Sequence, residues 1–125
     1  MSSAPLIGII GPCKAGKSTL AANLLKNGYN ARQIAQEHSF APDMWRIISN
    51  PEILIFLEVS FQSTLSRGLS WLESDYDEQR LRLTKAKEDA NLVVQTDHDS
   101  PEIVLSKVME FVDWQFRSLP PIQSK

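Results

Sequence analysis

The chain has 125 residues, 42% of them hydrophobic, with a formal net charge of −2 and a single cysteine. This length predicts one globular domain, residues 1–125, with one sheet and its covering helices. The slight acidic excess disfavours a general binder of nucleic acid or of an anionic membrane, because such proteins carry a basic excess. No apolar stretch approaches the roughly 20 residues that span a bilayer, and one cysteine suits a reducing compartment. We therefore expect a cytoplasmic protein.

The first predicted element is a buried strand at residues 6–10, whose sequence LIGII is apolar and largely β-branched. Residues 11–18 follow and fit the phosphate-binding pattern GxxxxGK with Ser as the last position. Residues 18–26 then carry apolar side chains at helical spacing and stop at Asn27-Gly28. A strand, a glycine loop and a helix are the context that this motif requires.

The loop at residues 11–18 is expected to bind the phosphate groups of a nucleoside triphosphate. Its two glycines let successive N–H groups point inward around an anion, beside the positive end of the helix. Lys17 adds a positive charge for the β- and γ-phosphates, and the Ser18 hydroxyl is a ligand for Mg²⁺. The residues expected to form this site are Gly11, Pro12, Cys13, Lys14, Ala15, Gly16, Lys17, Ser18 and Thr19.

The rest of the chain alternates between strand and helix patterns. In chain order we expect a weak strand at 29–36, a short helix after the turn at 41–43, a strand at 53–59, a helix at 61–72 interrupted at Gly68, a charged helix at 76–90, a strand at 91–96 and a closing helix that starts at Pro101 after an N-cap at Ser100. This alternation predicts an α/β fold with a parallel sheet of about four strands.

The order of these elements resembles the small P-loop kinases, the group that includes nucleotide, shikimate, gluconate and adenylylsulfate kinases. The likeness lies in the loop at 11–18, in the run ILIFLEVS at 53–60 with Arg67 after it, and in the stretch 76–97, which is similar to their lid helix and final strand. The resemblance implies a three-layer α/β/α P-loop NTPase domain that uses ATP and Mg²⁺ to phosphorylate a small-molecule acceptor. Only residues 27–51 fill the acceptor side, which is shortened.

A P-loop protein needs a carboxylate for the metal, at the end of a strand beside the first one. Glu37, after the weak second strand, is the favoured candidate. Glu58, at the end of the strongest apolar run, is the alternative, and a third option is that neither holds the metal. His38 is either an assisting base or a histidine of a surface turn. A metal cluster is not expected, since His38 and His98 have no partners at ligand spacing.

Phosphoryl transfer also needs positive charge around the transferring group. Arg67, just before a glycine that would serve as a hinge, is the first candidate to close over the phosphates, and Arg80 is the second. Arg82 is the third candidate, but it lies four residues after Glu78, which predicts instead an exposed ion pair on one helix. 

Lys17, Glu37 and Arg67 are therefore the expected catalytic residues, with Ser18 and Glu37 as the Mg²⁺ ligands. The leading interpretation is an ATP-dependent phosphotransferase. One alternative is a nucleotide-binding switch or assembly module without an acceptor, and another is a slow NTPase in which Glu37 orients water. A homo-oligomer is left open.

Overall fold

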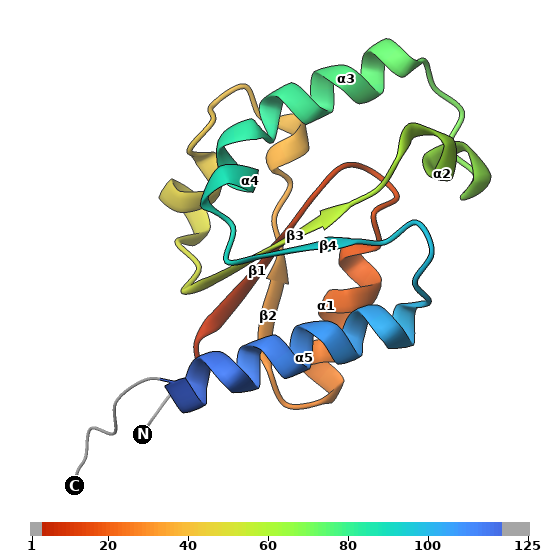
Figure 1. Cartoon of the computed structure of the whole chain (residues 1–125). Helices are drawn as coiled ribbons and strands as arrows, with labels where there is room; N and C mark the ends of the chain where they lie inside the picture. The colour runs from red at the N-terminus through yellow and green to blue at the C-terminus, as the bar shows by residue number, and fades with distance from the viewer. Residues whose placement is uncertain (1–3, 119–125) are drawn as a thin grey trace, which may run out of the picture.

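Four parallel strands form the centre of the protein, as expected from the alternating pattern. The computed structural model describes the backbone of residues 4–118 and the side chains of residues 4–115. The strands are β1 (Leu6–Ile10), β2 (Asn30–Gln33), β3 (Ile53–Glu58) and β4 (Leu92–Gln95), in the spatial order β2-β1-β3-β4 (Figure 1). β1 is therefore a central strand, paired with β2 on one side and with β3 on the other.

The helical elements connect these strands. They are α1 (Lys17–Lys26), the 3-10 turn η1 (Gln36–His38), the single π-helical turn η2 (Trp45–Ser49), α2 (Phe61–Ser66), α3 (Glu73–Arg82), α4 (Thr84–Asp89) and α5 (Pro101–Ser118). The N–H of Ile103 donates to the Ser100 hydroxyl at 3.3 Å, so the predicted cap of the closing helix is present. None of the helices within residues 4–118 has the length and apolar character needed to cross a membrane.

Three elements differ from the expectation. The second strand is shorter than residues 29–36, because the chain turns into η1 after it. The helix expected at 61–72 ends at Ser66, where Gly68 has a φ of 99° and its N–H and that of Leu69 donate to the carbonyls of Leu65 and Thr64. These two bonds form a Schellman motif, which closes a helix at a left-handed glycine. The charged helix is divided into α3 and α4 at Leu83.

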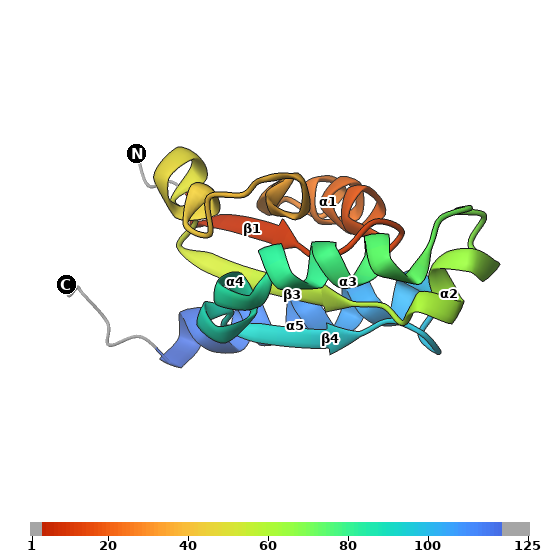
Figure 2. The same ribbon diagram turned by 90° about the horizontal axis from the view of Figure 1, so that it is seen from above.

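The sheet is covered on both faces, because successive side chains of a strand point to opposite sides. Ile53, Ile55 and Leu57 of β3 pack in one cluster with residues of α1 and α5, whereas Leu54 and Phe56 pack in a second cluster with Trp45, Leu83 and Ala86. Figures 1 and 2 show the same division, with α3 and α4 on the side of the sheet opposite to α5. Burial on both faces explains the continuous apolar run of β3.

The strand order creates a reversal point next to β1. After β1, the chain passes through α1 on one face of the sheet to reach β2. It then crosses back to β3, on the other side of β1. The connection from β3 to β4 runs through α3 and α4 on the opposite face. In open parallel sheets, ligands bind at the carboxyl ends of strands where the order reverses in this way. Residues 11–18, which we call the glycine loop, lie at this end of β1.

Gly11 provides a test of how closely the glycine loop approaches β3. A Cβ atom at Gly11 would lie 2.4 Å from the Leu57 carbonyl oxygen. We expect Gly11→Ala to destabilise the fold more than Gly28→Ala, in a comparison by urea unfolding. Gly28 has a φ of +87° and no atom within 4 Å of the added Cβ, so its replacement costs only backbone strain of about 1–2 kcal/mol. Equal losses in the free energy of unfolding for the two variants would contradict the prediction, because they would show that the loop can move away from β3 without cost.

Candidate functional site

The backbone of the glycine loop is shaped to receive an anion. Lys14 and Gly16 both have left-handed conformations, with φ of 67° and 99°. Within the described chain, the N–H groups of Gly16, Lys17 and Ser18 have no backbone acceptor, and no side chain caps the start of α1. Free N–H groups at the first turn of a helix attract negative charge, because the helix dipole adds to their own polarity.

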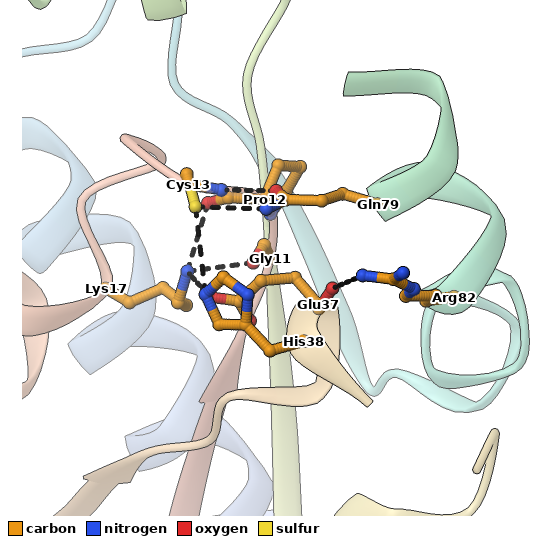
Figure 3. A network of polar contacts seen from close by, with 8 residues as sticks. All are labelled: Gly11, Pro12, Cys13, Lys17, Glu37, His38, Gln79 and Arg82. Atoms are coloured by element: carbon orange, nitrogen blue, oxygen red, sulfur yellow. Dashed lines mark hydrogen bonds and ion pairs between the residues drawn. The ribbon is translucent and has the colours of Figure 1, made fainter. Parts of the chain in front are cut away.

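Lys17 is buried under this loop instead of extending into solvent. Only 8% of the residue is exposed. Its Nζ donates to the carbonyl oxygens of Gly11 at 2.8 Å and Pro12 at 3.0 Å, and it forms an ion pair with Glu37 Oε2 at 3.0 Å (Figure 3). A buried ammonium is tolerated only when it is paired and hydrogen-bonded in this way.

Glu37 reaches Lys17 because β2 is the direct neighbour of β1. It lies on η1, four residues beyond the last residue pair of the β1–β2 ladder, which joins Ile9 to Gln33. Glu37 is 4% exposed, and its Oε1 has no hydrogen-bond partner among the described residues. The sequence placed Glu37 at the end of a strand, whereas the structure places it on a 3-10 turn that directs the carboxylate under the loop.

Gln79 is a site residue that the sequence analysis missed. Its Oε1 accepts from the N–H of Cys13 at 3.0 Å, and its Nε2 donates to Cys13 Sγ at 3.1 Å. Arg82, one turn further along α3, donates from Nη1 to the Glu37 carbonyl oxygen at 3.2 Å. Residues three apart lie on one face of a helix, so the spacing of Gln79 from Tyr76 and Arg82 was a signal that these polar residues face inward.

The other predicted charged residues lie elsewhere. Glu58, the alternative metal carboxylate, forms an ion pair with Lys87 and faces the α3–α4 side. Arg80 stacks on the Tyr76 ring at 5.7 Å instead of reaching the loop. Arg82 does form its predicted pair with Glu78, at 3.4 Å, but its side chain is only 18% exposed. Of the two helix arginines, the structure therefore brings Arg82 to the site.

Arg67 contacts the glycine loop at Lys14, next to the end of β4. Its Nη1 donates to the Lys14 carbonyl at 2.7 Å, and its Nη2 donates to the Thr96 carbonyl at 2.6 Å. The guanidinium thus joins the loop to the end of β4. Arg67 does not act as part of a lid in this structure, because the groups that it binds, including the Thr96 hydroxyl at 3.2 Å, belong to the glycine loop and to the end of β4.

A cavity of about 250 Å³ opens beside the loop. It extends from Lys14 and Thr19 to Arg67, and its far wall is the connection between β4 and α5, including Thr96 and Asp99. The cavity and the free N–H groups of α1 therefore share the residues around Gly16. A ligand with an anionic part and a larger neutral part fits such an arrangement.

Asp97 fixes this far wall. Its Oδ1 accepts from the N–H of Ser60 at 2.9 Å, which links the end of β4 to the start of α2. Burial alone would raise the pKa of Asp97, but hydrogen bonds from Ser60 and Ser63 and the charge of Arg67 outweigh it and lower the pKa below the ordinary value of 3.8. Asp97 therefore carries a structural negative charge at neutral pH.

No protein-family model and no curated protein matches the chain. Among solved structures, the chain is similar to a response regulator receiver domain protein (CheY-like) from Methanospirillum hungatei JF-1. The likeness covers 94% of this chain and 100% of that chain, with 16% sequence identity and a TM-score of 0.45. Similarity at this level assigns no ligand, partner or activity to the chain.

The predicted membership of the small P-loop kinases is wrong, and so are the P-loop kinase class of the fold and the phosphotransferase function. The solved structure reported above is a receiver domain and not a P-loop kinase. The features taken for a kinase lid have other roles, since α2 closes at Ser66 and Arg67 binds main-chain carbonyls. The switch and NTPase alternatives belong to the same overturned prediction of function and are not carried further.

The Lys17–Glu37 pair contributes to the stability of the fold. A Lys17 that faced only a ligand would be replaced without cost, but here its loss leaves a buried carboxylate unpaired. We expect Lys17→Met to lower the free energy of unfolding by about 3 kcal/mol, and Glu37→Gln in the same chain to recover part of that loss. Denaturant unfolding of both single variants and the double variant measures this coupling. Lys26→Met, at the exposed end of α1, is the control, and additive effects of the two site mutations would contradict the pair.

Asp97 predicts a pH dependence of stability. Because its pKa in the folded protein is lowered, its ionised form stabilises the fold above the ordinary value of 3.8, and this contribution is lost as the pH falls through the folded value. Asp97→Asn should therefore lower the melting temperature at neutral pH, and the difference from the unmodified protein should shrink in acid. The exposed Asp77→Asn serves as the control. A difference that stays constant with pH would contradict the assignment.

Proposed function

We propose that the glycine loop binds the phosphate groups of a nucleoside triphosphate together with Mg²⁺. This proposal requires neither a phosphoryl acceptor nor a relationship to kinases. The observation that carries it is the set of N–H groups at Gly16, Lys17 and Ser18, which have no backbone acceptor within the described chain, together with the Lys17 ammonium beneath the same loop at the reversal point of the sheet. Main-chain donors and a lysine are the groups by which proteins hold a polyphosphate.

The loop has room for the anion at Gly16. An added Cβ at this position would meet no atom within 4 Å, so the space in front of the backbone is open. Lys17 donates to two carbonyl oxygens of its own loop, Gly11 and Pro12. A phosphate oxygen is a stronger acceptor than a carbonyl oxygen because it is charged, so a bound phosphate would compete with these internal bonds for the ammonium.

Two side chains fit Mg²⁺. Mg²⁺ prefers oxygen ligands, and proteins hold it through one or two carboxylates together with substrate phosphates. Glu37 supplies a buried carboxylate with one oxygen unpaired among the described residues, and Ser18 supplies an exposed hydroxyl at the first turn of α1. When bound, the metal would neutralise phosphate charge. Glu37 would orient it from below the loop, and Lys17 would then share its carboxylate with the metal.

The cavity beside the loop fits the nucleoside. It begins where the loop turns into α1, at Lys14 and Thr19, and ends at Pro101 and Val104 of α5. Leu20, Pro101 and Val104 give the cavity an apolar wall, as in pockets for aromatic ligands generally. ATP is the nucleotide that we propose to test first.

Calorimetric titration separates the two parts of the site. We expect Mg²⁺–ATP to bind more tightly than adenosine, and Mg²⁺–tripolyphosphate to retain binding, because the phosphates contact the glycine loop. Lys17→Met should abolish binding of both phosphate ligands, whereas Lys26→Met, on the same helix but exposed, should leave it unchanged. Circular dichroism verifies that each variant is folded.

The choice of carboxylate is tested in the same titration. Glu37→Gln should remove the dependence of ATP binding on Mg²⁺, and Glu58→Gln should leave that dependence intact. Equal binding of ATP to the Lys17→Met variant and the unmodified protein would overturn the proposed function. A loss of Mg²⁺ dependence in Glu58→Gln alone would show that Glu58, and not Glu37, holds the metal.

A further inference from the structure

Three side chains with different metal-binding groups meet beneath the glycine loop. Cys13 comes from the loop, and Glu37 and His38 come from η1. The Cys13 thiol lies 4.0 Å from His38 Nε2, which lies 3.6 Å from Glu37 Oε2, and the three ligand atoms are all within 4.8 Å of one another (Figure 3). The sequence analysis did not predict a metal cluster, because Cys13 is distant in the chain from the other two residues.

The spacing suits one ion bound by all three groups. Ligands around a tetrahedral zinc ion, with bonds of about 2.0–2.3 Å, lie about 3.5 Å apart. The present separations are slightly larger, and the His38 side chain, which is 61% exposed, is free to rotate inward. A catalytic triad is a poorer description of the cluster, because the thiol and the carboxylate both approach the same nitrogen, Nε2, instead of opposite nitrogens of the ring.

Two further observations point to a ligand in this position. The Glu37 side chain is only 5% exposed, yet its Oε1 has no hydrogen-bond partner in the described part of the chain. Buried carboxylate oxygens without a partner are rare in folded proteins and call for an explanation. Cys13 is also positioned by two hydrogen bonds with Gln79, one from its N–H and one to its sulfur. The thiol position is therefore set by α3 and not by the loop alone.

We propose that Cys13, Glu37 and His38 bind a transition-metal ion of the Zn²⁺ class. A thiolate, an imidazole and a carboxylate form a ligand set of intermediate softness, which favours Zn²⁺ over Mg²⁺ or Ca²⁺. Three protein ligands leave the fourth position of a tetrahedral ion open. The Cys13 thiol loses its proton to solvent when the metal–sulfur bond forms.

The ammonium of Lys17 limits the affinity of this site. It pairs with the same carboxylate, at 3.0 Å from Oε2, and therefore repels a second cation there. The site also uses Cys13 of the glycine loop and the carboxylate assigned above to Mg²⁺. Insofar as the proposed function holds, zinc and Mg²⁺–nucleotide should exclude one another.

Cobalt(II) titration without nucleotide tests the site directly. Co²⁺ replaces Zn²⁺ in such ligand sets and gives a thiolate-to-cobalt charge-transfer band, and Cys13 is the only cysteine in the chain. We expect this band to appear, to disappear in Cys13→Ser, and to require more than about tenfold higher cobalt in His38→Ala. His98→Ala, which removes the other histidine, is the control and should titrate like the unmodified protein.

A second variant separates this proposal from the nucleotide site. Lys17→Met should bind cobalt more tightly, because a competing cation is removed, while it should bind Mg²⁺–ATP more weakly. The absence of a charge-transfer band, or a band that is unchanged in His38→Ala, would overturn the metal site whatever the outcome with ATP. Zinc-induced stabilisation measured by thermal unfolding provides the parallel readout, and it should be lost in both Cys13→Ser and His38→Ala.

Discussion

The buried ammonium of Lys17 is the contact on which the site depends. It joins the end of β1, the first turn of α1 and the turn after β2, because it binds two loop carbonyls and the Glu37 carboxylate at once. Removing a charge from water costs several kcal/mol, which the surrounding oxygens must offset. The shape of the glycine loop and the position of η1 are therefore determined together.

This arrangement places one carboxylate among competing cations. Glu37 pairs with Lys17, carries an oxygen without a hydrogen-bond partner among residues 4–115, and approaches both His38 and the Cys13 thiol. Its main chain is held separately, by Arg82 of α3. Because the backbone is fixed from another helix, exchange of the cation partner would need only side-chain rearrangement. The two ligands that we propose thus share one anchoring group.

The parts of the fold encoded locally were predictable from the sequence. The bounds of β1 agree with the expected strand, and the loop and α1 follow in the expected order, because burial, glycine and helical spacing are signals within a few residues. Burial of β3 on both faces was visible in its uninterrupted apolar run. The parallel arrangement of the strands was predictable from the alternation of strand and helix patterns along the chain.

The remaining features depend on contacts between distant residues. Gln79 reaches Cys13 across 66 positions, and although its spacing from Tyr76 indicates that it faces inward, no local pattern identifies the residue that it contacts. The turn at η1 replaces the end of a strand because Glu37 is drawn under the loop by Lys17. The kinase resemblance failed for the same reason, since a short motif describes one loop and not the order of the whole sheet.

The central position of β1 has a consequence for how the chain acquires its structure during synthesis. β1 and β2 belong to one βαβ unit that leaves the ribosome before β3, the other neighbour of β1, which follows about twenty residues after β2. Until β3 arrives, one hydrogen-bonding edge of an Ile-rich strand stays open, together with the face later covered by Phe56, Leu83 and Ala86. Open strand edges associate with one another, so the nascent N-terminal half is the part of this protein most in need of protection from aggregation.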